Sequence, residues 1–247
     1  MNCIGIIPAR YTATRFAGKV LANLLGKPVI QHVWEQAKKS QMLDDLIIAC
    51  DDERILEKAK DFGAKAILTS KDHLSGTDRL TEIVHDLEVK VVVNIQGDEP
   101  LVHFTMIDDA ANALLQNPDC VMATIITPIK DAQVLSDPNV VKVVVDKSGL
   151  AMYFSRAAIP FVRDKKAEPK VTFYKHIGLY SYTKDFLFTF KNLSASMLEA
   201  AEKLEQLRVL EAGFKIKTII TKYDTVGVDT PEDLKRVEEM LRGKQND

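Results

Sequence analysis

Short apolar runs recur along the chain, and segments of mixed polarity separate them. Apolar residues that follow one another without alternation are typical of strands buried on both faces of a sheet, and the mixed segments suit helices with one apolar face. We therefore predict an α/β fold with a doubly wound, mostly parallel sheet. The predicted strands span residues 3–7, 46–50, 66–68, 91–95, 122–126 and 140–145, and the predicted helices between the early ones span 28–40, 53–62 and 78–87.

The pattern changes after about residue 150. Two apolar runs, GLAMYFS at 149–155 and YKHIGLYSY at 174–182, are separated by a polar stretch that contains proline. This arrangement predicts antiparallel strands with a long excursion, and hence a small β-rich insertion at about 150–185. We also predict a long helix at 196–212, a strand at 214–221 and a last helix at 231–242, all within a single domain that spans residues 1–247.

The charge of the chain is nearly balanced but unevenly distributed. There are 33 Lys and Arg against 35 Asp and Glu, for a net charge of −2, and 46% of the residues are hydrophobic. This composition excludes a disordered chain and argues against a nucleic-acid or membrane-surface binder. No acidic residue precedes Glu35, whereas Arg10, Arg15, Lys19 and Lys27 all do. The first segment is therefore the basic part of an otherwise acidic protein.

Targeting signals and cysteine usage bear on where the protein works. No apolar run approaches the roughly 20 residues that span a bilayer, and the first ten residues do not resemble a signal peptide. We therefore expect a cytoplasmic protein that does not contact a membrane. Cys3, Cys50 and Cys120 lie far apart in apolar stretches without a CxxC pair, which favours reduced, buried thiols over a metal or redox site.

The loop IIPARYTATRFAGK, residues 6–19, directly follows the first predicted strand. In open α/β sheets, ligands bind beyond the carboxyl ends of the strands. Arg10, Arg15 and Lys19 could surround a polyphosphate there, and Gly18 would let the backbone approach it closely. The loop matches neither GxGxxG nor GxxxxGK(S/T), which argues against a dehydrogenase or a P-loop kinase. The alternative is that the three cations are only solvated surface residues.

Two acidic positions could form a site for a divalent cation. Asp98 and Glu99 follow a fully apolar strand in VNIQGDEP, and Asp229 precedes Pro231 in VGVDTPEDL. Mg²⁺ commonly takes one or two carboxylates together with substrate phosphates and waters. Each position has a plain alternative, because Gly-Asp and Glu-Pro form turns and because Asp229 or Thr230 could cap a helix.

The remaining candidates are small polar or charged groups at the ends of predicted elements. A helix start offers N–H groups to a base edge or an anion, strand-end cations suit the carboxylate of an acidic sugar, and helix amides and carboxylates suit hydroxyls. The alternatives are a plain helix cap, a satisfied strand histidine and a solvated helix face. These candidates are Ser75, Gly76 and Thr77 at a helix start, Arg156, Lys175 and His176 at strand ends, and Glu205 and Gln206 within a helix.

The chain closely resembles the 3-deoxy-manno-octulosonate (Kdo) cytidylyltransferases in eight segments, in this order: PARYTATRFAGK, TDRL, NIQGDEP, PNVVKVVVD, YFSRAAIP, KHIGLYSY, LEQLRVL and GVDTPEDL. The resemblance covers nearly the whole chain, and KHIGLYSY and LEQLRVL separate it from sialic acid cytidylyltransferases. It implies the Rossmann-like fold of nucleotide-diphospho-sugar transferases and a homodimer. It also implies a Mg²⁺-dependent reaction of CTP with Kdo that gives CMP-Kdo and pyrophosphate for lipopolysaccharide biosynthesis.

The resemblance also implies roles for individual residues. The catalytic residues would be Arg10, Lys19, Asp98 and Asp229, with Mg²⁺ held by Asp98 and Asp229. The nucleotide-binding residues would be Arg10, Arg15, Lys19, Ser70, Ser75, Gly76 and Thr77, and the sugar-acid-binding residues would be Gln96, Arg156, His176, Tyr180, Glu205 and Gln206. The chain departs from the family at Ala17, where proline is usual, and this change should make the loop more flexible.

Two other functions stay open at this point. The chain could be a cytidylyltransferase for a related acid, such as an amino-substituted Kdo or a nine-carbon sugar acid. It could also be a non-catalytic nucleotide-binding module, which would bind CTP without forming a CMP-sugar. The presence of both Asp98 and Asp229 together with the cations argues against this last function.

Overall fold

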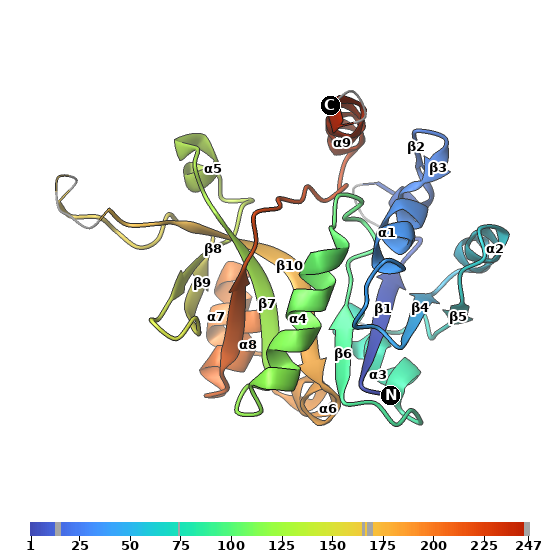
Figure 1. The fold of residues 1–247 in the computed structure, drawn as a ribbon, viewed down its shortest axis with the longest axis horizontal. Coiled ribbons are helices and arrows are strands. Elements are labelled where there is room, and N and C mark those ends of the chain that lie inside the picture. The colour runs from blue at the N-terminus through green and yellow to red at the C-terminus, as the bar shows by residue number, and fades with distance from the viewer. Residues whose placement is uncertain (13–15, 74, 165, 167–169, 245–247) are drawn as a thin grey trace.

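The computed structural model describes residues 1–12, 16–73, 75–164, 166 and 170–244. Within these residues nine strands form one sheet in the order β11-β7-β10-β6-β1-β4-β5, with β8 and β9 added beside β10 (Figure 1). The strands are β1 (Cys3–Ala9), β4 (Asp45–Cys50), β5 (Ala66–Leu68), β6 (Val91–Asn94), β7 (Met122–Pro128), β8 (Lys142–Val145), β9 (Ala151–Ser155), β10 (Tyr174–Thr183) and β11 (Ile216–Ile220); β2 (Asn23–Leu24) and β3 (Lys27–Pro28) form a separate hairpin.

Parallel pairing dominates the centre of the sheet. β1 lies between β4 and β6, so that Ile6 is beside Ile47 on one side and beside Asn94 on the other. The pairs β4–β5 and β7–β11 are also parallel. The chain first builds the sheet outward from β1 through β4 and β5 and then returns to place β6 on the other side of β1. The predicted doubly wound, mostly parallel α/β fold is confirmed.

The segment at about 150–185 is not an insertion separate from the main sheet. β10 runs antiparallel between β6 and β7, with Tyr180 beside Asn94, and only its first residues reach β8. The expected antiparallel strands are present, but this part of the chain begins with β8, and β10 belongs to the core. The physical reason is that β10 is apolar on both faces, because Ile177 packs into one core cluster and Tyr182 into the other.

Helices cover both faces of this sheet. Trp34, Ile55 and Met106 pack from three helices into the core on one face, and Leu80 and Phe186 pack from two others into the core on the opposite face. In Figure 1, α4 crosses the front of the sheet. The helices are α1 (Val29–Ala37), α2 (Glu53–Asp61), α3 (Gly76–Val84), α4 (Phe104–Gln116), α5 (Ala132–Ser136), α6 (Lys184–Asn192), α7 (Met197–Glu202), α8 (Gln206–Glu211) and α9 (Pro231–Lys244), with a short 3-10 turn, η1 (Lys19–Leu21).

A third, smaller core joins the β2–β3 hairpin to α9. Its buried members include Leu24 of the hairpin, Leu101, Val228 and Val237 of α9. Leu101 follows the first predicted carboxylate position, and Val228 directly precedes the second. The packing of this cluster therefore holds three loops of distant sequence beside one another.

The helix predicted at 196–212 is wrong as a single element, because α7 and α8 replace it. Lys203 lies between them with a φ of +55°, in the left-handed region that ends helices. Arg208 of α8 donates back to the carboxylate of Glu199 on α7 at 2.6 and 2.8 Å. The break also buries Leu204, which is 6% exposed, so tertiary packing outweighs the local helical pattern.

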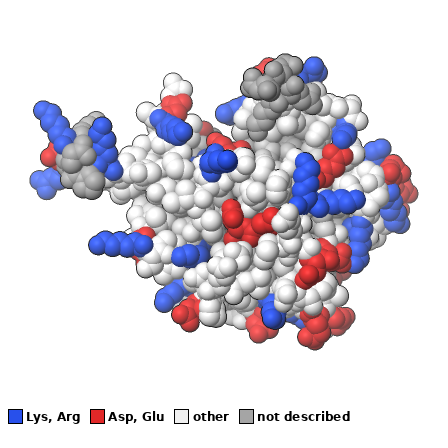
Figure 2. Space-filling model, in the orientation of Figure 1, with Lys and Arg blue, Asp and Glu red and all other residues white. Residues whose placement is uncertain are grey.

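No helix among the described residues is long and apolar enough to cross a membrane. Figure 2 shows Lys and Arg side chains interspersed with Asp and Glu side chains over one face of the molecule. Cys3, Cys50 and Cys120 are buried and form no disulfide, as predicted. Burial raises the pKa of the Cys50 thiol to about 11, which makes this thiol unreactive.

Candidate functional site

The candidate site lies where the chain leaves the carboxyl ends of β1 and β6. The loop after β1 carries Arg10 and Lys19, and the loop after β6 carries Asp98. The two ends lie very close together, because a Cβ on Gly97 would be only 2.9 Å from the backbone oxygen of Pro8. Glycine is therefore required at this approach. Open α/β sheets bind their ligands in such a crevice, where the direction of winding changes.

Lys19 joins two carboxylates that are far apart in the sequence. Its Nζ donates to Asp98 Oδ2 and, at 2.7 Å, to Asp229 Oδ1. Lys19 begins the turn η1 directly after Gly18, whose φ of +69° is in the left-handed region. The N–H of Gly18 donates to the Tyr11 carbonyl at 2.8 Å and closes the base of the loop. The glycine thus turns the chain so that Lys19 can reach both carboxylates.

The three side chains of this cluster differ in their exposure to water. Only 14% of the Lys19 side chain is exposed, against 27% for Asp98 and 45% for Asp229. Burial by itself would lower the pKa of Lys19, but the charges and hydrogen bonds of the two carboxylates outweigh it and raise this pKa. The lysine is therefore a permanent cation, and the carboxylates remain accessible to a ligand.

Asp229 and Thr230 have separate roles in the structure. The Thr230 hydroxyl accepts the N–H of Asp233 at 3.2 Å, and the Asp233 carboxylate accepts the N–H groups of Asp229 and Thr230 at 3.1 and 2.9 Å. Thr230 is therefore the cap of α9, and the Asp229 carboxylate accepts a hydrogen bond from Lys19. The N–H of Val228 donates to the Asp98 carbonyl at 2.8 Å and holds the two acidic segments together.

The second carboxylate is carried by residues 221–230, a segment that we call the strap. Lys175 of β10 fastens the strap, because its Nζ donates to Asp224 Oδ1 at 2.7 Å and to the Thr225 carbonyl at 2.8 Å. The Tyr223 ring adds a stacking contact with the segment before α4, with ring centroids 3.8 Å apart. Lys175, which was predicted as a strand-end cation, thus fixes the strap to β10.

Glu99 lies between the strap and β10. Burial, followed by the charge of Asp98, raises the pKa of Glu99 to about 7, although a hydrogen bond with Thr225 and the charge of Lys175 oppose the rise. Gly178 leaves space beside it, since a Cβ there would lie 3.4 Å from Glu99 Oε1. A carboxyl group that can hold a proton near neutral pH therefore stands next to the accessible carboxylate.

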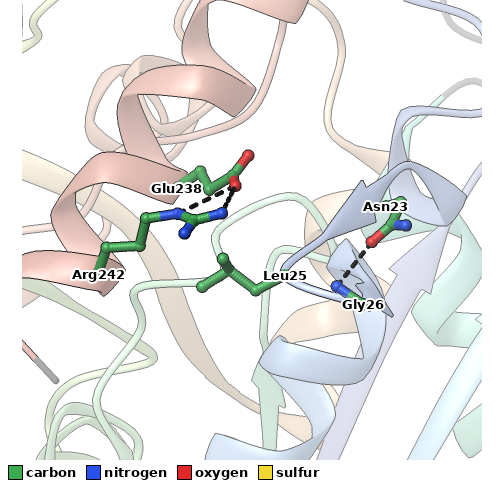
Figure 3. A pocket seen from close by; sticks show the side chains of 5 residues that line it. All are labelled: Asn23, Leu25, Gly26, Glu238 and Arg242. Atoms are coloured by element: carbon green, nitrogen blue, oxygen red, sulfur yellow. Dashed lines mark hydrogen bonds and ion pairs between the residues drawn. The ribbon is translucent and has the colours of Figure 1, made fainter.

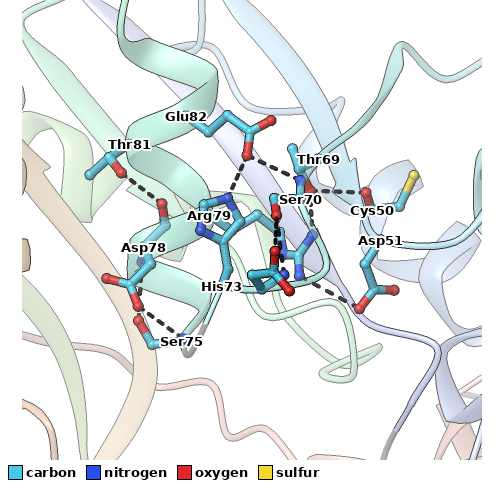
Figure 4. Close-up of polar contacts among 11 residues, drawn as sticks. Cys50, Asp51, Thr69, Ser70, His73, Ser75, Asp78, Arg79, Thr81 and Glu82 are labelled. Atoms are coloured by element: carbon cyan, nitrogen blue, oxygen red, sulfur yellow. Dashed lines mark hydrogen bonds and ion pairs between the residues drawn. The ribbon is translucent and has the colours of Figure 1, made fainter.

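A second cationic group lies beside the loop after β1. Arg79 of α3 is fully buried, its Nη1 donates to Thr69 Oγ1, and its Nη2 lies 3.5 Å from Asp51 Oδ2 (Figure 4). Burial lowers the pKa of Arg79, and the charge of nearby Arg10 lowers it further. Arg79 Nη2 and Arg10 Nη2 find no hydrogen-bond partner in the part of the chain that the structure describes.

Arg79 is a functional candidate that the sequence reasoning missed. Its segment, TDRL, was among the family motifs, but no role was attached to the arginine. A buried guanidinium with unused donors is costly unless an anion or a polar ligand group satisfies it. The available signal was an arginine on the apolar face of a predicted helix, beside Leu80.

The predicted nucleotide residues 75–77 begin α3. Ser75 is its cap, since its hydroxyl accepts the Asp78 N–H at 3.0 Å and the Asp78 carboxylate accepts the Ser75 N–H at 3.1 Å (Figure 4). A Cβ on Gly76 would lie 3.5 Å from Pro8 Cγ, so this glycine flanks the end of β1 opposite Gly97. The plain cap is therefore confirmed for Ser75, and Gly76 lies at the crevice.

The other predicted nucleotide residues lie farther out or beyond the described part of the chain. Ser70 is exposed, and its N–H donates to the Glu82 carboxylate at 3.1 Å (Figure 4). Arg15 lies outside the described residues. The structure thus brings Arg10, Lys19 and Gly76 to the end of β1, and the nucleotide-binding roles of Ser70 and Arg15 stay predictions.

Thr77 connects α3 to the predicted sugar-binding residues. Its hydroxyl donates to Glu205 Oε2 at 2.9 Å, and burial raises the pKa of Glu205. Tyr182 of β10 contacts both Thr77 and Asn94. Gln206 is 3% exposed, and among the described residues neither its Nε2 nor Asn94 Oδ1 has a hydrogen-bond partner. Buried amides of this kind are normally satisfied, so they indicate a place for the polar groups of a ligand.

His176 and Tyr180 lie on β10 with their rings 5.3 Å apart. His176 is 8% exposed, packs edge-on against Phe154, and places its Nε2 3.0 Å from the hydroxyl of Thr124. Burial, with a smaller contribution from Lys175, lowers the pKa of His176 to about 3. These contacts favour a satisfied strand histidine, which positions Tyr180 rather than offering a charge to a ligand.

Arg156 and Gln96 differ in how they relate to the site. The Arg156 guanidinium donates to the carbonyls of Glu202 and Pro138 at 2.8 and 3.0 Å, and no hydrogen bond joins it to the Lys19 cluster among the described residues. Gln96 follows β6, and a Cβ on Gly178 would lie 3.7 Å from its Cγ. Gln96 therefore borders the same space as the acidic residues after β6, and a sugar-binding role for Arg156 stays a prediction.

Two surface pockets are formed by other residues. The pocket between the hairpin and α9 measures about 610 Å³, and its Arg242 is paired with Glu238 at 2.7 Å (Figure 3). It contains no residue of the predicted site. A second pocket of about 540 Å³ lies at the ends of β7 and β11 and shares Lys175 with the strap. The polar chemistry of the candidate site is therefore concentrated in the crevice, not in these pockets.

The donor set at the crevice suits one particular class of metal. No three His, Cys, Asp or Glu side chains among the described residues are grouped as metal ligands. Asp98 and Asp229 nevertheless offer hard oxygen atoms that already converge on one cation. Mg²⁺ needs only one or two carboxylates when phosphates and waters supply its other ligands. The pair therefore fits Mg²⁺ that arrives with a phosphate ligand.

Comparisons with known sequences agree over nearly the whole chain. The family model described as "Cytidylyltransferase" matches residues 4–219. The 3-deoxy-manno-octulosonate cytidylyltransferase of Syntrophobacter fumaroxidans is 51% identical over 244 residues, which cover 98% of this chain and 97% of that protein. The protein of the same name from Solibacter usitatus is 48% identical over 239 residues, with coverages of 97% and 94%.

Solved structures give the same result for the fold. The structure of CMP:2-keto-3-deoxy-manno-octonic acid synthetase complexed with CTP has a TM-score of 0.93 and 39% identity, and covers 99% of this chain and 100% of that one. The 4-diphosphocytidyl-2C-methyl-D-erythritol synthase of Anaerococcus prevotii has a TM-score of 0.65 at 14% identity and 98% coverage of both chains, which shows a shared fold alone.

Proposed function

Because the chain belongs to the 3-deoxy-manno-octulosonate cytidylyltransferase family, we propose that it transfers the cytidylyl group of CTP to the anomeric hydroxyl of Kdo. The products are CMP-Kdo, for lipopolysaccharide biosynthesis, and pyrophosphate. The observation that carries this proposal is the convergence of Lys19, Asp98 and Asp229 at the crevice between β1 and β6. Arg10 and Arg79 place further positive charge beside it.

The reaction needs positioning and charge neutralisation more than covalent help from the protein. The anomeric oxygen of the sugar forms a bond to the α-phosphorus while the bond from that phosphorus to pyrophosphate breaks in line, and the hydroxyl proton passes to water. Arg10 and Lys19 would compensate the negative charge of the triphosphate and of the leaving pyrophosphate. No side-chain nucleophile is required.

Asp98 and Asp229 would hold Mg²⁺ on the phosphates. When bound, the metal would reduce the negative charge that repels the attacking oxygen and help this oxygen to ionise. The protein's part is to keep the two carboxylates together, through the bond between Val228 and the Asp98 carbonyl and through the fastening of the strap by Lys175.

The sugar acid would bind where α3, β10 and α8 meet. Asn94 Oδ1 and Gln206 Nε2 are buried without described partners, and a polyhydroxylated acid can satisfy both atoms. Glu205 is held beside them by Thr77 at 2.9 Å and can accept a further hydroxyl. Gln96, at the end of β6, would contact the end of the sugar that faces the phosphate.

We also propose a homodimer that works in the cytoplasm, where CTP is available. The part of the chain around β9 exposes large apolar side chains, namely Met152 at 62%, Phe161 at 87% and Val171 at 45%. Large apolar side chains that are strongly exposed are a feature of many contact surfaces. Light scattering on the purified protein tests this, and Phe161→Ser should shift the mass toward that of one chain; a wild-type monomer would contradict the homodimer.

Pyrophosphate release tests the function directly. The purified protein is supplied with CTP and Mg²⁺, and with Kdo, an amino-substituted Kdo or a nine-carbon sugar acid. We expect turnover with Kdo. Turnover with another acid alone would replace the substrate, and CTP binding without pyrophosphate release from any acid would indicate a non-catalytic nucleotide-binding module.

A further inference from the structure

The Lys19 ammonium occupies the space that a metal would need between the two carboxylates. Its Nζ bonds to Asp98 and, at 2.7 Å, to Asp229. Mg²⁺ binds carboxylate oxygens at about 2.1 Å and requires its other ligands in near-octahedral positions. An ammonium within hydrogen-bond distance of the same oxygens would both overlap with that coordination shell and repel the ion.

We propose that Lys19 acts as a stand-in for the metal. Its ammonium group holds Asp98 and Asp229 together until the nucleotide binds. This inference rests on the proposed function. CTP draws the ammonium onto its phosphates, and Asp98 and Asp229 would then hold the metal that accompanies the nucleotide. Metal binding at this pair is consequently coupled to nucleotide binding, and the protein alone binds the metal weakly.

The local structure allows such an exchange without movement of the backbone at residues 18–20. The backbone around Lys19 is fixed, because Gly18 donates to the Tyr11 carbonyl at 2.8 Å and Val20 is 2% exposed. The four-carbon stem of lysine can move its charge by several ångströms through rotation of its own bonds. Nearby, Arg10 Nη2 has no described hydrogen-bond partner, so it can meet phosphates without first giving up a carboxylate.

The two carboxylates also need a cation when no ligand is bound. They come from different loops, and the bond between Val228 and the Asp98 carbonyl brings them close together. Two neighbouring carboxylates without a cation repel each other and would push the strap away from the loop after β6. The ammonium therefore keeps the metal site assembled, and at the same time it keeps the site closed to free metal.

The test measures the binding of Mn²⁺ to the protein without CTP. Electron paramagnetic resonance quantifies the free ion in each titration. Lys19→Met should bind Mn²⁺ about tenfold more tightly than the wild type, or better, because a competing cation is removed. The double variant Lys19→Met/Asp98→Asn should lose this gain, which locates the ion. Lys27→Met is the matched control, since Lys27 is a surface lysine bonded to Glu35 at 2.9 Å.

Equal Mn²⁺ affinities of the wild type and Lys19→Met would overturn the inference, as would an unchanged gain in the double variant. If Lys19→Met does not fold, the wild type still decides. Millimolar Mg²⁺ should leave its melting temperature unchanged without CTP, and a clear rise would refute a closed site. Pyrophosphate release from CTP and Kdo is scored separately, so failure of the stand-in role leaves the proposed function intact.

Discussion

Two regions of the molecule differ in how their polar groups are paired, namely the carboxyl ends of β1 and β6 and the place where α3, β10 and α8 meet. Lys19 satisfies Asp98 and Asp229 in the first region. In the second, Gln206 Nε2 and Asn94 Oδ1 are buried without described partners. Under the proposed function, the first region would exchange these bonds when CTP binds, and the second would offer its buried polar atoms to the sugar acid.

The difference follows from the kind of group that each region contains. An unpaired carboxylate at the crevice would cost far more than an unpaired amide, and Lys19 offsets this cost for Asp98 and Asp229. An unsatisfied amide costs about 1–3 kcal/mol, which a folded protein of this size can tolerate at a few positions. Variants on either side should therefore respond differently in activity and in stability.

The largest effect should come from the charged region. Asp98→Asn removes a charge that we place on the metal and on Lys19, and it should lower kcat by about two decades or more while the protein stays folded. Asp61→Asn, on the exposed surface of α2, is the matched control. Steady-state kinetics with CTP and Kdo measure both, and a near-normal kcat for Asp98→Asn would contradict the assigned role.

The contact that brings the two loops together should be next in size. Gly97→Ala places a Cβ 2.9 Å from the backbone oxygen of Pro8, so the ends of β1 and β6 must separate. Overpacking of this kind costs about 1–3 kcal/mol, and displacement of Asp98 should reduce kcat as well. Gly243→Ala, where a Cβ meets nothing within 4 Å, should cost nothing by urea unfolding. Unchanged stability of Gly97→Ala would show that the loops adjust freely.

In the second region, His176 should make the free energy of unfolding depend on pH. The pKa of His176 falls to about 3 in the folded protein from 6.5. The neutral ring therefore stabilises the fold above pH 6.5, and this contribution is lost as the pH falls toward 3. Between about pH 6.5 and pH 5 the free energy of unfolding should drop by about 2 kcal/mol through this group.

Urea unfolding at several pH values measures this effect. His176→Asn should lack that part of the decline, whereas His85→Asn, with 72% of the histidine side chain exposed, should keep it. If wild type and His176→Asn decline in parallel between these pH values, then His176 is not held neutral by its buried contacts with Phe154 and Thr124.

The smallest change in the free energy of unfolding should come from Gln206, and a change in the KM for Kdo should accompany it. Gln206→Leu replaces a buried amide, whose Nε2 has no described partner, by an apolar side chain of similar size, so the free energy of unfolding should rise by up to about 1 kcal/mol. The KM for Kdo should rise about tenfold with little change in the KM for CTP. Gln116→Leu, on the exposed side of α4, should alter neither. Equal rises in both KM values would place Gln206 outside the sugar pocket.

The apolar runs predicted the parallel strands, and three of these runs belong to β1, β6 and β7, which are buried on both faces. They did not predict where β10 lies, since an antiparallel strand in the middle of a parallel sheet has the same local pattern as one at its edge. The helix at 196–212 was predicted from its leucines, and the left-handed Lys203 that divides it has no local signal. α4 was missed, although Met106, Ala110 and Leu114 follow one another at helical spacing.

Within the site, the sequence predicted which residues carry the charges, but it did not predict how these residues pair. The sequence pointed to four charged residues because they lie in loops and in motifs shared with the family, namely Arg10, Lys19, Asp98 and Asp229. The capping of α9 by Thr230 could not be separated from capping by Asp229, because both residues are good caps and their order does not decide between them. The buried position of Arg79 likewise depends on Asp51 and Thr69, which come from other elements.

The amino-acid sequence by itself determined the fold class, the family and the basic loop after the first strand, because hydrophobic periodicity and ordered motifs are local properties of the chain. Only the tertiary structure decided that Lys19 bridges two carboxylates 79 and 210 residues away, and that Asn94 Oδ1 and Gln206 Nε2 are buried without described partners. The reason is physical: pairing and burial are set by contacts between distant segments, here the close approach of Gly97 to Pro8 and of the strap to the loop after β6.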